Sequence, residues 1–395
     1  MRICHVITRL ILGGAQENTV STVLGLAKLG YDVELVSGLP TPGEGDLLES
    51  FSNSPSLLSL SPHLVRPVHP WHDALATRDL IRHFKSNLPG LVHTHSGKAG
   101  ILGRLAARRC HAKLIVHGIH GPSFGPFQGA SANFVYRSAE SIASHWTDHF
   151  VVVAQAMTDQ YLEAGIGHPD QYTRIFSGFD LSPYLSIPLQ ANLCRANTSF
   201  EATDFVVAVV ARLAPLKGHE ELLQLAGMCR QKIPRLRMLF VGDGPLRPQL
   251  EKQVKDLNLE RVVVFAGMVP PSQVPGLLAQ CDVTAHLSRR EGLPRALSQS
   301  LAAGRPVLAY DCDGAREVCL HDRTGFLAQP GDLGAMARHL ETLAGNPPLR
   351  LTLGQNGRAL VKVDFSSETM VQRTHQLYLR LGVPNPARSN ATLKG

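Results

Sequence analysis

The feature that most constrains the fold is an alternation of short apolar runs with stretches of helical periodicity along nearly the whole chain. Such alternation is typical of parallel sheets whose strands are connected by helices. In the first half, the predicted strands are Ile3–Thr8, Val33–Val36, Leu91–His93, Lys113–His117 and Phe150–Val153. The predicted helices there are Ala15–Leu29, Ala74–Ser86, Ala99–Arg109 and Gln155–Ala164, and Pro40–Pro70 is expected to be irregular.

A second series of strands and helices begins at Asp204, after a proline-containing polar segment. Its predicted strands are Phe205–Ala211, Arg237–Val241, Val262–Ala266, Val283–His286 and Pro306–Ala309. Its predicted helices are His219–Arg230, Gln249–Leu257, Gln273–Gln280, Arg295–Ala303 and Leu333–Leu343. A chain of 395 residues is long enough for two such α/β domains. The predicted organisation is a Rossmann-like domain (1–182), a linker (183–203), a second Rossmann-like domain (204–365), a helix (366–382) and a flexible tail (383–395).

Composition excludes several other classes of protein. Hydrophobic residues make up 44% and charged residues 18%, which is typical of a globular protein. No apolar stretch approaches the roughly 20 residues of a membrane span, and His5, Thr8 and Arg9 interrupt the start too early for a signal peptide. We therefore expect a cytoplasmic protein. The seven scattered cysteines have no metal-binding spacing and favour reduced thiols.

Positive charge is concentrated between Ala76 and His117, where eight lysines and arginines stand against one acid, Asp79. This region is either a solvated helix face or a surface that attracts anionic phosphates or a membrane. Since aromatic residues do not alternate with the charges and no nucleic-acid motif is present, no nucleic-acid partner is expected.

In doubly wound domains, ligands bind at the carboxyl ends of the strands, so the loops there are the candidate site. Gly13 and Gly14 precede the first helix, where a backbone without side chains lets a ligand approach. In the second half, Arg212 and Lys217 lie five residues apart in one such loop, a pattern that suits a diphosphate. A tight turn and two solvated cations are the alternatives.

Three later loops add further candidates. Gly244 and Val269 follow strands and place backbone groups where a nucleotide could contact them. Glu291 precedes the amides of Gly292 and Leu293, with Gln299 in the helix that follows. The nearby acids Asp311 and Asp313 resemble a metal-binding pair, but no further oxygen ligands are apparent, so no metal is expected.

Taken together, these loops resemble glycosyltransferase family 4, whose members have the GT-B fold, across roughly Met1–Leu381. The resemblance rests on the order and spacing of six sequence runs. They are Ala211–Gly218, Val241–Pro245, Arg290–Pro294, Ala302–Val307, His93–Ala99 and Val116–Gly121.

The resemblance implies two Rossmann-like domains that face each other across a cleft, with the C-terminal helix returning to the first domain. It implies a UDP- or GDP-sugar donor as co-substrate, no metal, retention of configuration, and a saccharide or lipid-linked acceptor. Arg212 and Lys217 would neutralise the diphosphate, and Glu291 would hold the sugar. His120 would line the reaction centre, with His117 as the alternative. The expected setting is envelope polysaccharide or glycolipid synthesis, with peripheral association at the inner face of the membrane.

One position departs from the family pattern, which has a second glutamate where this chain has Gln299. An amide oxygen still accepts a ribose hydroxyl, but the charge-assisted bond is lost. A catalytically weak relative that acts as a binding or regulatory partner therefore stays an alternative. A nucleotide-sugar 2-epimerase is a further one, and the missing Gly-x-Gly-x-x-Gly fingerprint disfavours a dehydrogenase. The oligomeric state is not predicted.

Overall fold

The computed structural model describes residues 1–40, 45–125, 127–189 and 200–386. The chain divides into two compact units. Unit 1 consists of Met1–Phe179 together with the chain from Phe365 onward, and unit 2 is Asp180–Asp364. Parts of the predicted linker (190–199) and tail (387–395) lie outside the described residues, as does Cys194.

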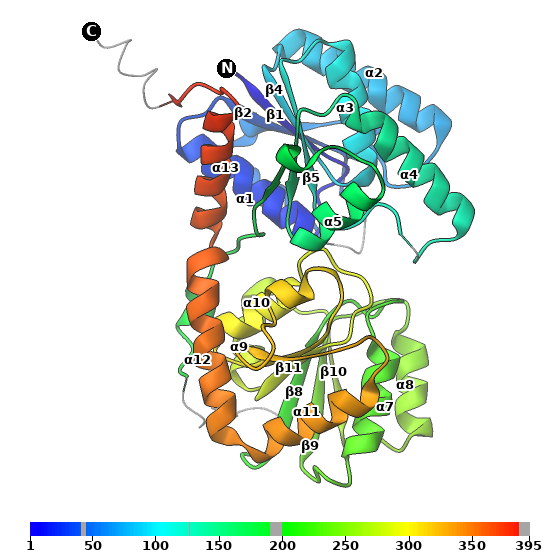
Figure 1. Ribbon diagram of the computed structural model, residues 1–395, viewed down its shortest axis with the longest axis vertical. Coiled ribbons are helices and arrows are strands. Elements are labelled where there is room, and N and C mark those ends of the chain that lie inside the picture. Colours follow the sequence, from blue (N-terminus) through cyan, green and yellow to red (C-terminus); the bar gives the residue numbers. More distant parts are fainter. Residues whose placement is uncertain (41–44, 126, 190–199, 387–395) are drawn as a thin grey trace. The chain divides into compact units, whose positions relative to one another are not determined.

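Unit 1 is built on a seven-stranded parallel sheet in the order β3-β2-β1-β4-β5-β6-β7 (Figure 1). Its strands are β1 (Ile3–Ile7), β2 (Val33–Ser37), β3 (Leu58–Leu60), β4 (Leu91–His95), β5 (Leu114–Ile119), β6 (His149–Val152) and β7 (Tyr172–Arg174). Its helices are α1 (Gly14–Lys28), α2 (Pro70–Asn87), α3 (Gly97–Arg109), α4 (Ala130–Ser144), α5 (Gln155–Glu163) and α13 (Ser367–Arg380), with 3-10 turns at Leu48–Phe51, Pro55–Leu57 and Pro169–Gln171.

Alternate residues of β1 pack into the two cores that cover the faces of this sheet. Ile3 and Ile7 join a cluster with α1, whereas Cys4 and Val6 join a cluster with α2 and α3. This alternation follows from the period of two in a β-strand. All five predicted strands and four predicted helices of the first half are present. The irregular segment contains the short strand β3, and α4 was not predicted.

The C-terminal helix α13 packs against α1, as the sequence predicted (Figure 1). Asn18 of α1 donates a hydrogen bond to the Met370 sulfur, at 3.1 Å. A side chain at Gly25 would collide with Val371, since a Cβ there would lie 2.3 Å from its nearest methyl group. The sequence thus keeps a glycine where the two helices approach most closely.

Unit 2 is built on a six-stranded parallel sheet in the order β10-β9-β8-β11-β12-β13. Its strands are β8 (Phe205–Val210), β9 (Leu236–Val241), β10 (Val263–Gly267), β11 (Val283–His286), β12 (Val307–Tyr310) and β13 (Gly325–Ala328). Its helices are α6 (Ser182–Leu185), α7 (His219–Cys229), α8 (Arg247–Asp256), α9 (Val274–Ala279), α10 (Arg295–Ala302), α11 (Leu333–Gly345) and α12 (Pro347–Asp364), with 3-10 turns at Pro271–Gln273 and Asp313–Glu317.

Within the described parts of the chain, no helix is both long and apolar enough to cross a membrane. The six cysteines in those parts are free thiols, and four of them are buried. Both sheets are parallel throughout, so each unit gathers its strand-to-helix loops at one edge. Those loops hold the candidate residues of each unit.

Candidate active site

In unit 2, the loop that follows β8 is held by the two loops beside it. The Leu213 amide donates to the Asp243 carbonyl at 3.1 Å, and the Leu246 amide donates to the Leu213 carbonyl at 3.0 Å. On the other side, the Arg289 amide donates to the Leu216 carbonyl at 2.8 Å. The backbone that carries Arg212 and Lys217 is therefore fixed at both ends of the loop.

Two glycines allow these loops to approach so closely. Gly218 has a φ of +74°, and a Cβ there would lie 2.1 Å from the Leu287 carbonyl oxygen. A Cβ on Gly244 would lie 2.4 Å from the Leu213 carbonyl oxygen. Packing against a neighbouring loop thus gives a structural reason for Gly244, whose predicted nucleotide contact stays a prediction.

The centre of the site is an ionised carboxylate that contacts two nitrogen donors. Lys217 Nζ donates to Glu291 Oε1 at 2.5 Å, and His286 Nε2 lies 2.9 Å from the same oxygen. Burial alone would raise the pKa of Glu291, but the Lys217 charge and the His286 hydrogen bond outweigh it and lower the pKa well below its usual range. The Glu291 side chain is 14% exposed. Glu291 is therefore a charged acceptor close to a cation at the carboxyl end of β11.

Asp313 fixes the backbone of the same loop. Its Oδ2 accepts the Glu291 amide at 2.7 Å, and its φ of +46° is uncommon for a residue other than glycine. The other acid of the pair, Asp311, accepts from Arg316 at 2.8 Å. The two carboxylates thus accept hydrogen bonds from protein groups in different directions.

The amides that follow Glu291 are placed differently from the Glu291 amide. Within the described residues, the Gly292 and Leu293 amides donate no hydrogen bond to a protein acceptor. They precede α10, where free amides and the helix dipole both favour an anion. This geometry is compatible with the predicted contact to sugar or phosphate.

Three further predicted residues of unit 2 are exposed or half-buried. Arg212 is exposed, and Val269 is half-buried in the turn after β10. Gln299 is half-buried on the second turn of α10, and its side chain makes no hydrogen bond to the described residues. Its amide is therefore available to a ligand.

In unit 1, the glycines that precede and begin α1 differ in their surroundings. Gly13 is the N-cap of α1, and a Cβ there would lie 2.7 Å from Gln16 Oε1. A Cβ on Gly14 would meet no described atom within 4 Å. Packing within the described residues therefore does not require a glycine at position 14, and the predicted close approach of a ligand there stays a prediction.

The other candidate of unit 1, His120, belongs to a buried group of histidines. Its Nε2 lies 2.9 Å from Nδ1 of His95, whose Nε2 lies 2.8 Å from Nδ1 of His5. His117 lies on the opposite face of the sheet, where its Nδ1 contacts the Thr94 hydroxyl at 2.9 Å and its ring packs against Gly100 of α3. Because His117 is 1% exposed beneath a helix, the geometry favours His120 of the two.

Burial keeps these imidazoles neutral. It lowers the pKa of His5 to about 3 and that of His120 to about 4, and it lowers the pKa of His95 well below its usual range. Neutral imidazoles are potential metal ligands, and His5, His93 and His95 lie within reach of one ion. However, the His93 and His95 rings are stacked with centroids 4.3 Å apart, so their in-plane lone pairs do not converge. Hydrogen bonding accounts for this cluster better than metal binding.

Models of two families together match most of the chain. The glycosyl transferases group 1 model matches residues 193–360, and the Glycosyltransferase Family 4 model matches residues 12–182. The chain belongs to glycosyltransferase family 4. Family 4 enzymes are retaining glycosyltransferases that use a nucleotide-sugar donor, and this chain is an enzyme of that kind.

Relatives cover nearly the full length of this family 4 chain. It is 25% identical to an Escherichia coli UDP-Gal:alpha-D-GlcNAc-diphosphoundecaprenol alpha-1,3-galactosyltransferase, over 97% of this chain and 98% of the relative. It is 23% identical to the Staphylococcus aureus capsular polysaccharide biosynthesis glycosyltransferase CapM, over 89% and 91%. The Anabaena HepE structure with UDP-glucose superposes with a TM-score of 0.80 at 22% identity, over 96% of this chain and 100% of that one. The fold is therefore GT-B, as predicted.

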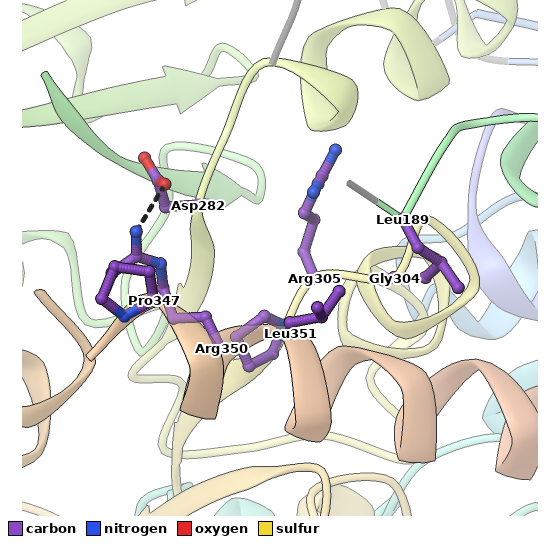
Figure 2. Close-up of a pocket in the computed structure, with 8 residues that line it drawn as sticks. Leu189, Asp282, Gly304, Arg305, Pro347, Arg350 and Leu351 are labelled. Carbon is purple, nitrogen blue, oxygen red and sulfur yellow. Dashed lines mark ion pairs between the residues drawn. The ribbon is translucent and has the colours of Figure 1, made fainter. Parts of the chain in front are cut away.

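The depression shown in Figure 2 lies on unit 2, away from the loops that hold the predicted donor residues. Asp282, Arg305 and Pro306 line it, and they precede β11 and β12, so it lies at the amino ends of those strands (Figure 2). Figure 2 shows Arg350 of α12 reaching Asp282, at 3.4 Å. Family 4 chemistry belongs at the opposite, carboxyl edge, so we assign this depression to packing of α12.

Sequence reasoning missed three contributors to the glycosyltransferase site. His286 was noted only as the end of a strand, and Asp313 only as a doubtful metal ligand. His219, at the start of α7, is 2% exposed, and burial lowers its pKa to about 4, with the charges of His286 and Lys217 adding to the effect. A neutral His219 avoids a further positive charge beside Lys217. The only available signal was the position of each residue at a strand end or helix start.

Proposed function

We propose that this enzyme transfers a sugar from a UDP- or GDP-linked donor to a saccharide or lipid-linked acceptor in envelope polysaccharide or glycolipid synthesis. The observation that carries the proposal is the Lys217–Glu291–His286 group beside the free amides of Gly292 and Leu293. A cation and amides suit a diphosphate, and an ionised carboxylate suits sugar hydroxyls. The names of the E. coli and S. aureus relatives support a role in surface polysaccharides.

In the proposed mechanism, Lys217 keeps its bond to Glu291 while its remaining N–H groups turn to the diphosphate, because an ammonium has three donors. The bond between the anomeric carbon and the diphosphate oxygen breaks, and negative charge develops on the diphosphate. Lys217, Arg212 and the Gly292 and Leu293 amides stabilise that charge where it develops.

The acceptor hydroxyl attacks the anomeric carbon from the face that the diphosphate leaves, which retains the configuration. A new carbon–oxygen bond forms, and the hydroxyl proton passes to an oxygen of the departing phosphate. His120 contributes a hydrogen bond to the sugar, and Gly14 lets the backbone of α1 approach the diphosphate. No carboxylate base is needed for this step.

For the acceptor, we propose the basic surface of unit 1. Arg104 does not contribute to it, because it is buried in an ion pair with Glu140 at 2.5 Å, and Lys98 is paired with Asp73. The exposed basic residues of the surface are Arg78, Arg82, Lys85, Arg108, Arg109 and Lys113. Helix α4 of the same unit exposes apolar side chains, with Phe134 72% and Val135 60% exposed. Charge and apolar contact together favour a lipid-linked acceptor at an anionic membrane surface.

The donor is tested by thermal unfolding in the presence of a panel of UDP- and GDP-sugars, because a ligand that binds the folded state raises the melting temperature. One donor should stabilise the protein and be consumed, with the anomeric configuration of the product read by NMR. Failure of every nucleotide-sugar and of free UDP and GDP to stabilise the protein would overturn the proposal. Retention on anionic but not neutral liposomes at low salt tests the membrane part, and equal retention on both would remove it.

Gln299 favours a second candidate, a catalytically weak relative that acts as a binding or regulatory partner. The amide at this position has no protein partner within the described residues, and it cannot form the charge-assisted bond that the family pattern provides. Donor hydrolysis separates the two readings. An enzyme releases UDP or GDP from its donor slowly without acceptor, whereas a binding partner releases none.

A further inference from the structure

A continuous line of hydrogen-bonding groups runs from His120 into the interior of unit 1. It passes from His120 to His95 (2.9 Å) and from His95 to His5 (2.8 Å). From His5 Nε2 it continues to the Tyr378 hydroxyl at 3.2 Å, and from that hydroxyl to Nδ1 of His93 at 2.7 Å. We call these five groups the histidine relay. Four come from β1, β4 and the end of β5, and Tyr378 comes from α13.

Strand register brings the relay together. His5 of β1 is the partner of His93 of β4, and His95 of β4 is the partner of Gly118 of β5. A Cβ on Gly118 would lie 2.8 Å from His95 Nδ1 and 3.3 Å from His120 Nε2. The glycine near the carboxyl end of β5 therefore leaves the space in which His95 and His120 meet.

Every group of the relay is uncharged near neutral pH. His5, His93, His95 and Tyr378 are at most 2% exposed. Burial lowers the pKa of each histidine and raises the pKa of Tyr378. A neutral imidazole and a phenol each carry one hydrogen that can be donated. The relay thus contains five such hydrogens, one for each group.

Counting these hydrogens leaves two arrangements in which no group inside the relay keeps an unused hydrogen. Four links use four hydrogens, so the fifth lies at one end of the relay, on His93 Nε2 or on His120 Nδ1. In the first case all four histidines are Nε2–H tautomers, and in the second all four are Nδ1–H tautomers. Each distance within the relay lies in hydrogen-bond range for either direction.

The two ends of the relay differ in what an N–H would meet. His93 Nε2 is buried and has no hydrogen-bond partner among the described residues, so a hydrogen there would be an orphan donor. Buried orphan N–H groups are rare because they lose water without a replacement acceptor. His120 Nδ1 is also buried and has no described partner, but it follows the carboxyl end of β5, the edge at which doubly wound domains bind ligands, so a bound ligand can supply the acceptor.

We propose that His95, His5, Tyr378 and His93 are positioning residues that hold His120 as the Nδ1–H tautomer, so that it donates a hydrogen bond to the bound donor sugar. The identity of that ligand rests on the proposed function. The tautomer of His120 does not depend on it. Since Tyr378 belongs to α13, the C-terminal helix then fixes the hydrogen bonding of a residue that contacts substrate.

The tautomers are measured directly by long-range ¹H–¹⁵N NMR of the full chain labelled at histidine, near neutral pH and without substrate. Single His→Gln variants assign the resonances. We expect His5, His93, His95 and His120 all to be Nδ1–H tautomers. Nε2–H tautomers, or a mixture at His120, would overturn the proposal, whether or not the protein proves to be a transferase.

A matched pair of variants tests the effect on catalysis. Tyr378→Phe removes the hydroxyl that joins His5 to His93. Without that hydroxyl, the remaining hydrogen bonds of the relay can run in either direction. The control is Tyr31→Phe, because Tyr31 packs edge-on against Tyr378 and its hydroxyl contacts His375 at 2.7 Å, outside the relay.

For Tyr378→Phe we expect a mixed tautomer at His120 and a fall in kcat of about three- to tenfold, the effect of one hydrogen bond. The donor KM should stay within about twofold of the unmodified enzyme's, because the ground-state contacts remain. Tyr31→Phe should change neither the tautomer nor kcat.

An unchanged His120 tautomer in Tyr378→Phe, or equal losses in both variants, would refute the relay. If Tyr378→Phe does not fold, the NMR of the unmodified chain decides. If the unmodified enzyme turns over no donor, the proposed function fails while that NMR result stands.

Discussion

The two units have the same kind of sheet but differ in the charge of the polar side chains near its carboxyl edge. Unit 1 gathers histidines that burial keeps neutral, and it links them to one another. Unit 2 places the charged pair Lys217 and Glu291 near its surface, where Lys217 is 29% exposed. A deeply buried side chain stays uncharged unless it has a partner of opposite charge, whereas side chains at a partly exposed site can stay ionised where a ligand can reach them. The difference suits a unit that orients a sugar and a unit that binds a diphosphate.

The largest expected difference between the units is their response to acid. The unfolded chain protonates its histidines near pH 6.5, but the buried histidines of unit 1 stay neutral to a much lower pH. Stability therefore falls as the pH drops below about 6.5, by about 1.4 kcal/mol per pH unit for each such histidine. The histidines concerned are His5, His93, His95, His117, His120 and, with less burial, His149.

Among the described residues of unit 2, the histidines with a lowered pKa are the buried His219 and the half-buried His339. Its Glu291 has a lowered pKa and loses its contribution only as the pH falls below about 4.5, the ordinary value for a glutamate. Urea unfolding at pH 7 and pH 5, with pulse proteolysis and mass spectrometry to assign the cleaved unit, checks the comparison. Unit 1 should lose several kcal/mol more than unit 2, and equal losses in the two units would contradict it.

A second prediction concerns the buried ion pair of unit 1. Arg104→Met leaves Glu140 buried without its partner, since the two side chains are 0% and 1% exposed. The loss of stability should be about 3–5 kcal/mol by urea unfolding, with nucleotide affinity unchanged at temperatures where the variant is folded. Adding Glu140→Leu should restore much of the loss, because it removes the unpaired charge. A double variant no more stable than the single one would show that the charge is not the cause.

The Lys217–Glu291 ion pair of unit 2, for which we propose a functional role, should behave in the opposite manner. Lys217→Met should lower kcat/KM about 100- to 1000-fold, the effect of removing one group that stabilises transition-state charge. Stability should change by less than about 1 kcal/mol, because the pair is partly exposed. Lys232→Met is the control, because Lys232 pairs with Glu341 at 2.9 Å on the same unit and is 67% exposed. Comparable kinetic losses in both variants would remove the special role of Lys217.

The smallest expected effect is at Gln299. Gln299→Glu should tighten UDP or GDP binding by about tenfold, because a carboxylate forms a charge-assisted bond to the ribose. Calorimetry measures the change, and Gln253→Glu on α8 controls for the added charge. Unchanged or weaker affinity in Gln299→Glu would mean that the ribose is held elsewhere.

The sequence predicted the parallel sheets well because apolar strand runs are local features. It missed β3 and β7, which are three residues long, and β13, which is four residues long. It also missed α12, because Pro347 and Pro348 begin that helix and Gly354 lies within it. The structure explains that glycine, since a Cβ there would lie 2.1 Å from the Gly304 carbonyl oxygen. Tertiary packing here overrides the low helix propensity of glycine.

The candidate site was predictable only where its residues are neighbours in sequence. Arg212 and Lys217 share a loop, and Glu291 precedes its amides, so local chemistry identified them. The contact of Glu291 with Lys217 and the path from His120 to Tyr378 depend on which strands are adjacent and in which register. His93 was predicted as the end of a strand, and no local feature indicated which side chains lie opposite it.

Because unit 1 includes α13, its first 179 residues lack part of their own core while the chain is being synthesised. Tyr378 and Met370 fill positions in that core, so a nascent chain that ends before them leaves apolar surface and His5 uncovered. Unit 2 is continuous and can fold completely first. Helix α13, the last part of unit 1, therefore leaves the ribosome only after all of unit 2 has been synthesised. The unit whose translation begins first is the last to complete its fold.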